Sequence, residues 1–573
     1  MSSNAPASPT SRSIHDLIGI AENATFSADP AALFRELLAA AGMTLGNPAG
    51  IIAANTRLVW GYAGAIRAAA ERAMGRDNPG PIAIADGDKR FADPAYQENP
   101  VYFLLAQQYL LFSRLVDELL DTAGVSGTRE AKARFAARFL VDALAPTNTL
   151  AGNPAALRKA FDTGGKSIVR GLQNLVHDLR HNGGWPSQVD SSGFEVGVNM
   201  GATPGSVVYR SDLIELIQYS PQTPDTYAVP LLFCPPWINK FYLMDMAPGK
   251  SLIEWAVQRG HTCFAISYRN PDESMSELGF RDYLFQGPLD AVRVVRDITN
   301  VPAVNTVSVC LGGTLTALGL AYNAARSDDS IKSATFLNTH TDFTEQGVLG
   351  IFTDEPTIAA VERKMRKKGF LDAADMAQTF SALRANDLIF QYVSNNWLQG
   401  NKPPAFDLLA WNEDSTRMPA RMHSEYLRSC FLRNEFARGE FEIDGDRLDP
   451  GLVDIDTYVL AAVDDHIVPW VSGYKTAQLL GGKTRFVLST SGHIAGVINP
   501  PSPKAKHWVN DSLPDDAHEW KANADLVNGT WWQDWAAWIA ERGGEMVPAP
   551  DHEGSDDYPP IERAPGSYVR ATA

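Results

Sequence analysis

The feature that most constrains the fold is a cysteine at an abrupt junction between a β-strand pattern and a helix pattern. Residues 305–309 read NTVSV, a run typical of a buried strand, and residues 314–325 are compatible with a helix. Between them, residues 310–313 read CLGG, a turn of small residues. Such a turn holds its first side chain above the end of the strand and directs the first N–H groups of the helix toward it. The junction therefore predicts Cys310 as a nucleophile.

Small residues around a cysteine also occur where a strand packs closely against a helix, so Cys310 alone is compatible with a buried small side chain. Asp465 and His493 favour the nucleophile, because each follows a β-strand pattern, at residues 457–462 and 486–489. The order thiol, carboxylate, imidazole along the chain is that of α/β-hydrolases. We predict a triad in which His493 takes the thiol proton and Asp465 bonds to the other ring nitrogen.

The oxyanion hole of such a site uses two backbone N–H groups, one directly after the nucleophile and one from the loop after an earlier strand. The first N–H is that of Leu311. Residues 234–240 read CPPWINK, and we predict the Trp237 N–H as the second donor, because two prolines precede it and stiffen the turn. His466 either lines the pocket or only packs, and the sequence leaves both open.

The distribution of helical and β-rich patterns along the sequence predicts two domains after a leader. Residues 1–26 are rich in Ser, Ala and Pro, and we expect a mobile leader that is not a secretory signal. Residues 27–200 read mostly helical, whereas residues 201–573 alternate short β-rich runs with helical stretches. The β-rich runs are 229–233, 262–267, 306–309, 334–338, 457–462 and 486–489. This alternation predicts an α/β-hydrolase fold with a mostly parallel sheet, preceded by a helical N-terminal domain.

More than a hundred residues separate the strand patterns that end near residue 338 and begin at residue 457, which is too many for an ordinary crossover. We expect a large cap insertion at about residues 342–445 that excludes water from the site. Transfer of an acyl group from a thioester to a thiol is nearly thermoneutral, so the acyl-enzyme stays activated. A cysteine nucleophile beneath a cap therefore favours transfer of an acyl group from an acyl-CoA to a hydroxyl.

Composition excludes several classes of function. A formal net charge of -17 argues against nucleic acid or an anionic membrane as the main partner. The four cysteines are widely spaced without a CxxC pair, which predicts neither a disulfide framework nor a zinc ribbon and fits a reducing cytosol. The apolar runs are short and broken, so we expect no transmembrane segment. We also expect no metal and no cofactor, with a CoA thioester as the substrate.

Longer motifs in the chain resemble the polyhydroxyalkanoate synthases, which polymerise 3-hydroxyacyl-CoA into storage polyester. The motifs are PPWINKFY at 235–242, NPD at 270–272, FDLLAWN at 406–412, DHIVPW at 465–470 and SGHIAGVINPP at 491–501. The length, with its helical N-terminal domain, and the ending APGSYV at 564–569 resemble class I members. Class I members typically polymerise short units, such as those of 3-hydroxybutyryl-CoA, as homodimers at the surface of cytoplasmic polyester granules.

The resemblance implies roles for individual residues. Cys310 is then the acylated nucleophile, His493 its base and Asp465 the group that assists attack by the incoming 3-hydroxyl. Asp245, which follows the INK loop, is implied as a supporting residue. The implied partners are 3-hydroxyacyl-CoA, the growing polyester chain, the granule surface, a second copy of the chain and granule-coat proteins.

Two residues depart from the family pattern. Ser308 stands where the elbow usually has its first glycine, and Trp237 stands where many members have a smaller residue, so that its ring would narrow the acyl channel. Two other interpretations remain open: a cysteine-nucleophile ester or thioester hydrolase, such as a polyester depolymerase, and an inactive granule-associated scaffold. Cys310→Ala separates them, because either enzyme loses activity and a scaffold is indifferent.

Overall fold

The computed structural model describes residues 30–85 and 87–572 of the chain, in two compact units. Unit 1 contains the chain up to Gln188 together with Gln378–Pro404, and unit 2 contains Val189–Ala377 and the chain from Ala405 onward. The predicted leader, residues 1–26, lies outside the described residues. The middle of the long insertion thus groups with the N-terminal helices, a grouping that the sequence analysis did not include.

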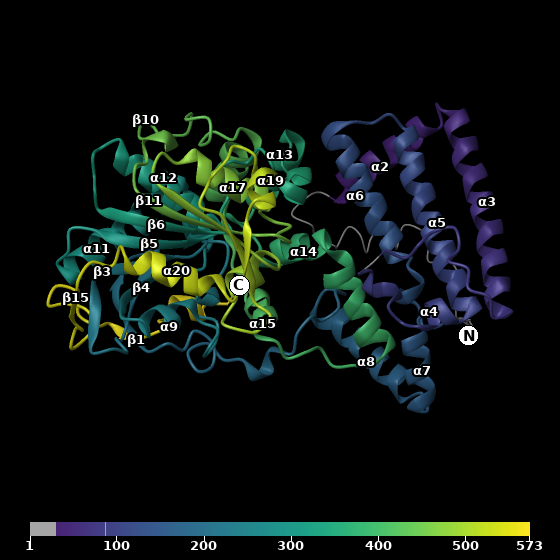
Figure 1. Ribbon diagram of the computed structural model, residues 1–573, viewed down its shortest axis with the longest axis horizontal. Coiled ribbons are helices and arrows are strands. Elements are labelled where there is room, and N and C mark those ends of the chain that lie inside the picture. Colours follow the sequence, from purple (N-terminus) through teal and green to yellow (C-terminus); the bar gives the residue numbers. More distant parts are fainter. Residues whose placement is uncertain (1–29, 86, 573) are drawn as a thin grey trace, which may run out of the picture. The chain divides into compact units, whose positions relative to one another are not determined.

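Unit 1 is built of helices (Figure 1). They are α2 (Pro30–Thr44), α3 (Pro48–Ala73), α4 (Ala95–Glu98), α5 (Pro100–Thr122), α6 (Gly127–Ala143), α7 (Pro154–Asp162) and α8 (Lys166–His181). Three of them begin with an Asn-Pro pair: the side chains of Asn47, Asn99 and Asn153 each accept a backbone N–H of the first turn, and proline occupies the first helical position. Helix α3 packs on α5, and α2 packs on α6.

The segment Gln378–Pro404 contributes two π-helical turns, η8 (Asn386–Phe390) and η9 (Val393–Leu398), to unit 1. Close contact with α8 explains the grouping. The Trp397 indole donates to the buried Asp178 carboxylate at 2.7 Å. A side chain at Gly171 would overlap the backbone of Trp397, so the two helices approach each other to backbone distance.

Within the described residues, twelve strands of unit 2 form one sheet. Its six central strands are parallel and lie in the order β12–β11–β6–β5–β3–β4. They are β3 (Asp225–Cys234), β4 (His261–Tyr268), β5 (Val304–Val309), β6 (Ile331–Leu337), β11 (Asp456–Ala462) and β12 (Thr484–Ser489). These six strands confirm the six β-rich runs of the sequence.

Antiparallel strands extend the sheet at both edges, so the whole sheet is mixed. Beside β12 lie β13 (Lys506–Val509) and β14 (Asp525–Asn528). Beside β4 lie β2 (Ile214–Tyr219), β1 (Gly205–Arg210) and β16 (Glu562–Arg563), and β15 (Met546–Pro548) pairs with β3. These outer strands were not predicted from the sequence.

Helices cover both faces of the sheet (Figure 1). One core contains side chains of α11 (Asp290–Thr299), α12 (Leu311–Ala324), α17 (Trp470–Leu479) and α19 (Ala517–Ala522). The other contains α9 (Leu252–Val257) and the four tryptophans of α20 (Trp531–Ala540). Strand residues alternate between the cores: Leu232 belongs to the first, whereas Leu231 and Phe233 belong to the second. This layering is the predicted α/β arrangement.

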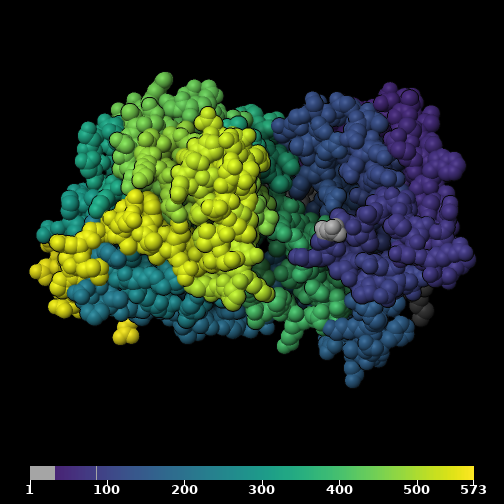
Figure 2. All heavy atoms as spheres, in the orientation of Figure 1, coloured from purple at the N-terminus to yellow at the C-terminus, as the bar shows by residue number. Residues whose placement is uncertain are grey.

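The carboxyl-terminal segment returns to the first strands of unit 2. In Figure 2, yellow spheres from the last part of the chain lie against blue and teal spheres of unit 2. Glu215 of β2, fully buried, accepts the Ser567 hydroxyl at 2.8 Å and the Tyr568 N–H at 3.0 Å. Between residues 30 and 572, no single helix is long and apolar enough to cross a membrane; the pair Leu33–Thr44 and Pro48–Ala73, bent by 98°, passes by length and composition.

Candidate active site

Cys310 lies at a strained turn between β5 and α12. Its backbone has φ 51° and ψ -123°, a conformation that residues other than glycine rarely adopt, and its N–H donates to the Leu337 carbonyl at 2.9 Å. The two glycines that follow are required by space, because a Cβ atom at Gly312 would lie 2.6 Å from the Pro235 oxygen and one at Gly313 would overlap the side chain of Thr339. The turn is therefore packed on both sides by the ends of neighbouring strands.

Ser308, the predicted departure from the family's glycine, fits the elbow. Its side chain is fully buried, and its hydroxyl donates to the Thr316 hydroxyl at 2.9 Å. The Thr316 hydroxyl in turn donates to the Gly312 carbonyl at 2.8 Å. Each buried hydroxyl thus has a partner, so the serine introduces no unsatisfied polar group.

Asp465 and His493 form a buried hydrogen-bonded pair. Asp465 follows β11, and His493 begins α18 (His493–Val497) after β12. The His493 Nδ1 lies 2.6 Å from one carboxylate oxygen of Asp465, and the other oxygen accepts the N–H groups of Ile467 at 2.8 Å and Val468 at 2.9 Å. Both carboxylate oxygens are therefore occupied, and the Asp465 side chain has no exposed surface.

The imidazole of His493 interacts with Cys310 as well as with Asp465. Burial alone lowers the pKa of His493, but the negative charge of Asp465, the hydrogen bond to it and the interaction with Cys310 together raise that pKa well above its usual range. Because Nδ1 faces Asp465, Nε2 is the ring nitrogen left for Cys310. The structure thus brings the three predicted side chains together.

The four cysteines, all within the described residues, differ in burial. Cys234, Cys263 and Cys430 are buried, and burial raises the pKa of each thiol, that of Cys234 to about 12. Cys310 alone is partly exposed. Since the thiolate is the reactive form, only Cys310 combines access with a neighbouring imidazole.

The two backbone groups predicted as oxyanion donors have no partner among the described residues. The N–H of Leu311 opens helix α12, and neither it nor the N–H of Trp237 donates to a backbone or side-chain acceptor there. The Trp237 ring is 2% exposed and packs against Phe280, Tyr283 and Tyr426 with centroid distances of 5.9 to 6.2 Å. The ring therefore belongs to the core around the site.

The two supporting candidates lie in different surroundings. Asp245 is buried, and its carboxylate accepts the hydroxyl of Thr203 at 2.5 Å and the Thr203 N–H at 3.2 Å. Burial raises the pKa of Asp245, and hydrogen bonds from Thr203 and Ser251 oppose this. Its contacts therefore fix the segment before β1. His466 is half-buried beside Asp465.

Two residues that were not predicted from the sequence lie close to these groups. Tyr426, from η10 (Tyr426–Leu432) in the insertion, is near enough to interact with Cys310, and burial raises the pKa of Tyr426 well above its usual range. His340, after β6, is 3% exposed, and burial lowers its pKa to about 4 although the Asp465 charge opposes this. Neither residue belongs to a short motif; the density of aromatic residues in the insertion was the available signal.

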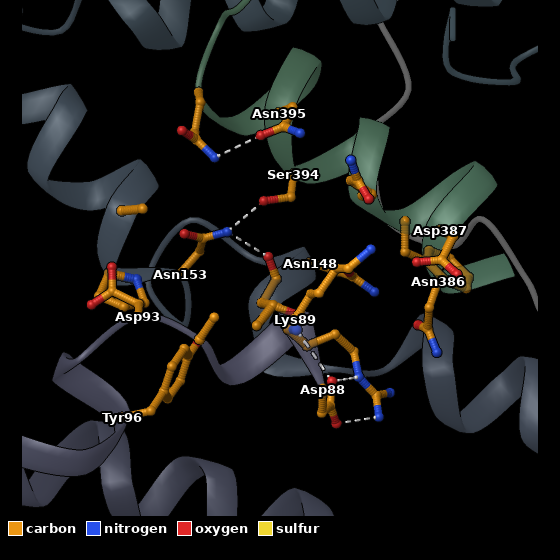
Figure 3. A pocket seen from close by; sticks show the side chains of 18 of the residues that line it. Asp88, Lys89, Asp93, Tyr96, Asn148, Asn153, Asn386, Asp387, Ser394 and Asn395 are labelled. Carbon is orange, nitrogen blue, oxygen red and sulfur yellow. Dashed lines mark hydrogen bonds and ion pairs between the residues drawn. The ribbon is translucent and has the colours of Figure 1, made fainter. Parts of the chain in front are cut away.

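A separate cavity of about 750 Å³ lies within unit 1 (Figure 3). Its wall combines the residues after position 86 with the π-helical turns η8 and η9. Side-chain amides line much of it, from Asn148, Asn153, Asn386, Gln391, Asn395 and Gln399. Over residues 30–85 and 87–572, no group of three or more His, Cys, Asp or Glu side chains is arranged to hold a metal ion.

The sequence matches two family models. Residues 87–256 match the poly-beta-hydroxybutyrate polymerase (PhaC) N-terminus, and residues 230–500 match the alpha/beta hydrolase fold. The poly(3-hydroxyalkanoate) polymerase of Methylorubrum extorquens is 42% identical over 544 residues, which are 94% of this chain and 90% of that protein. This chain belongs to the poly(3-hydroxyalkanoate) polymerase family. Another family member, the PhaC subunit from Cupriavidus necator, is 42% identical over 85% of this chain and 83% of its own length.

The family match confirms the α/β-hydrolase fold and the family resemblance that the motifs indicated. Among solved structures, the monoacylglycerol lipase of Paleococcus ferrophilus covers 58% of this chain and 98% of its own, with 10% identity and a TM-score of 0.32.

Proposed function

We propose that this chain polymerises 3-hydroxyacyl-CoA into polyester, with release of CoA, through a covalent acyl-Cys310 intermediate. The observation that carries the proposal is the position of Cys310 in a strained strand–helix turn beside the hydrogen-bonded pair of His493 and Asp465, in a chain of the polymerase family. This arrangement supports nucleophilic catalysis by a thiol with an imidazole base.

In the first half-reaction the Cys310 sulfur attacks the thioester carbonyl of the substrate, and His493 takes the thiol proton. The carbonyl electron pair moves onto oxygen, where the N–H groups of Leu311 and Trp237 stabilise it. When the carbonyl reforms, the bond to the CoA sulfur breaks, and His493 returns its proton to that sulfur. The products are acyl-Cys310 and free CoA.

In the second half-reaction a 3-hydroxyl attacks the acyl-Cys310 carbonyl and loses its proton to His493. When the carbonyl reforms, the bond to the Cys310 sulfur breaks and His493 returns the proton to that sulfur, so the polyester grows by one ester. We assign Asp465 an indirect role in this step. Its two carboxylate oxygens already accept hydrogen bonds from His493 and from two backbone N–H groups, which favours assistance through the charge on His493.

Packing around Cys310 supports transfer to a hydroxyl over hydrolysis. The insertion between β6 and β11 supplies Tyr426, Phe343 and Phe431 to the same core that contacts Cys310. The rings of Phe343 and Phe431 lie 4.9 Å apart, and those of Tyr426 and Phe431 lie 5.2 Å apart. An apolar cover excludes water, which is the competing acceptor of the acyl group.

We further propose a class I enzyme that uses short 3-hydroxyacyl units as a homodimer at the surface of cytoplasmic granules. The class follows from the carboxyl-terminal motif and the helical N-terminal part. Helix α3 supports an apolar partner, because Ile52, Val59, Trp60 and Ile66 are each 57 to 73% exposed. A polyester surface with granule-coat proteins fits such a face.

The test measures CoA release and product with 3-hydroxybutyryl-CoA for the wild type and Cys310→Ala. We expect insoluble polyester with an equivalent amount of CoA, and neither from the variant. Free 3-hydroxybutyrate without polymer would indicate a hydrolase. Absence of CoA release from this substrate and from longer 3-hydroxyacyl-CoA would indicate a scaffold.

A further inference from the structure

The loop of residues 235–240 is bonded along its second half to residues 411–416 of the insertion. The contacts are the Ile238 carbonyl with the Thr416 hydroxyl at 2.6 Å, an antiparallel bridge between Asn239 and Ser415, and the Lys240 carbonyl with the Trp411 indole N–H at 2.9 Å. Three consecutive residues of the loop thus have partners within six residues of the insertion. The same loop carries Trp237, the proposed oxyanion donor.

A charged contact joins the same two segments. The Lys240 ammonium lies 2.5 Å from one Asp414 oxygen, and the Tyr242 hydroxyl donates to the other at 2.8 Å. The Lys240 side chain is 4% exposed. A buried ammonium is unfavourable unless it is paired, so Asp414 is what allows Lys240 to lie in this position. Burial and the Asp414 charge raise the pKa of Tyr242, which keeps its hydroxyl protonated as a donor.

We propose that Asp414 is a positioning residue for the oxyanion hole: through Lys240 and Tyr242 it fixes the loop that presents the Trp237 N–H to the reacting carbonyl. The inference rests on the proposed function of Trp237. It assigns the insertion a role in the chemical step in addition to covering the site. Oxyanion donors stabilise charge only when they are held at hydrogen-bond distance from the position where it develops, so a loosened loop slows acylation.

Two reactions of Cys310 separate this role from a general effect on the fold. In acylation by p-nitrophenyl acetate, the sulfur bonds to the carbonyl carbon, the electron pair moves onto oxygen, and collapse of that oxyanion expels p-nitrophenolate while His493 holds the thiol proton. In alkylation by iodoacetamide, the sulfur displaces iodide and no oxyanion forms. Misplacement of the Trp237 N–H slows only the first reaction.

The variants are Asp414→Asn, which removes the charge at nearly constant shape, and Asp414→Glu, which restores it. Asp407→Asn is the matched control, because Asp407 begins α15 (Asp407–Glu413), the helix that ends directly before Asp414, and pairs with the half-exposed Lys250 at 2.6 Å. Thr416→Val is a milder second variant, since it removes one hydrogen bond to the loop and leaves no buried charge unpaired. Circular dichroism and thermal melting establish that each variant is folded.

We expect Asp414→Asn to lower the p-nitrophenolate burst rate at saturating ester by about 10- to 100-fold, with the half-saturating ester concentration and the alkylation rate within about threefold of wild type. Asp414→Glu should recover part of the loss, and Asp407→Asn should react like the wild type. Thr416→Val should acylate about three- to tenfold more slowly. If Asp414→Asn does not fold, the acylation rate of the folded Thr416→Val protein tests the positioning role instead.

The proposal is overturned if acylation and alkylation slow in parallel, or if acylation by folded Asp414→Asn and Thr416→Val equals that of the wild type. A failure of the proposed function has a different signature. There, the wild type is acylated and Asp414→Asn slows only acylation, yet no polymer forms from 3-hydroxybutyryl-CoA; this result supports the positioning role and contradicts the polymerase.

Discussion

A Cβ atom at position 312 tests whether the elbow and the loop after β3 must lie as close together as they do. Built on the backbone of Gly312, that atom lies 2.6 Å from the Pro235 carbonyl oxygen and closer still to that of Cys234. Ordinary contact begins at 3.4 Å, so the helix or the loop must move by at least 0.8 Å to relieve the contact with Pro235, and by more to relieve that with Cys234. Since both carbonyls precede Trp237, this movement changes the separation of the Leu311 and Trp237 N–H groups.

The size of the effect follows from that displacement. A misplacement of about 1 Å in groups that bind a transition state costs on the order of 100-fold in rate. Overpacking costs about 1–3 kcal/mol of stability, partly offset by the gain of about 1 kcal/mol when alanine replaces glycine in a helix. We therefore expect Gly312→Ala to release CoA from 3-hydroxybutyryl-CoA about 100-fold more slowly, with a free energy of unfolding lowered by no more than about 2 kcal/mol.

Gly319→Ala is the control in the same helix. Its Cβ atom would meet the end of the Leu284 side chain at 3.2 Å, which can rotate away, so we expect a rate within about threefold of wild type and unchanged or slightly higher stability. CoA release and urea unfolding are measured for both variants. A folded Gly312→Ala protein with a wild-type rate would refute the argument that this close approach sets the geometry of the site.

Three further predictions follow from buried charges. Asp465→Asn removes the main charge that raises the pKa of His493. A raised histidine pKa stabilises the fold fully below about pH 6.5, and this stabilisation decreases as the pH rises through the folded pKa. The loss in melting temperature should therefore be larger at about pH 6 than at about pH 9.5. Arg90→Met removes the closer of the two arginines paired with Asp142, whose side chain is 6% exposed, and leaves Arg138 at 3.4 Å and the Tyr109 hydroxyl at 3.2 Å. It should lower the free energy of unfolding in urea by about 1–3 kcal/mol; no change in the urea midpoint would contradict this. Glu215→Ala removes the carboxylate that accepts the N–H groups of Ser567 and Tyr568 in the carboxyl-terminal segment. Trypsin cleavage of that segment, measured by mass spectrometry, should become at least about tenfold faster. An unchanged cleavage rate would show that the segment is held by other contacts.

The parallel strands and the elbow were predictable because their signals are local. A β-branched run followed by small residues defines β5 and Cys310 within ten positions, and the same kind of run precedes Asp465 and His493. Parallel strands end at one edge of the sheet, so the chain order of the three residues also indicated that they meet. The edge strands gave no comparable signal, since β16 is two residues long and β14 four.

The division of the insertion between the units was not predictable from local patterns. It depends on contacts between residues far apart in sequence, such as the indole of Trp397 with the carboxylate of Asp178, and on the absence of a side chain at Gly171. Tyr426 and His340 were missed for the same reason, because packing rather than a motif places them near Cys310 and Asp465. Local composition predicts a helix or a strand, whereas contacts between residues far apart in the sequence depend on how the whole chain folds.

The contacts of the insertion within unit 2 give one physical account of why a polymerase differs from a hydrolase on the same fold. Aromatic residues of the insertion pack in the core that contacts Cys310, which disfavours water as the acyl acceptor. Residues 411–416 bond to the loop that carries Trp237, whose N–H we propose as an oxyanion donor. A cap that opened freely to admit water would also release this loop. On our proposal, exclusion of water and stabilisation of the oxyanion depend on the same insertion, and a variant that loosens it should lose rate before it gains hydrolysis.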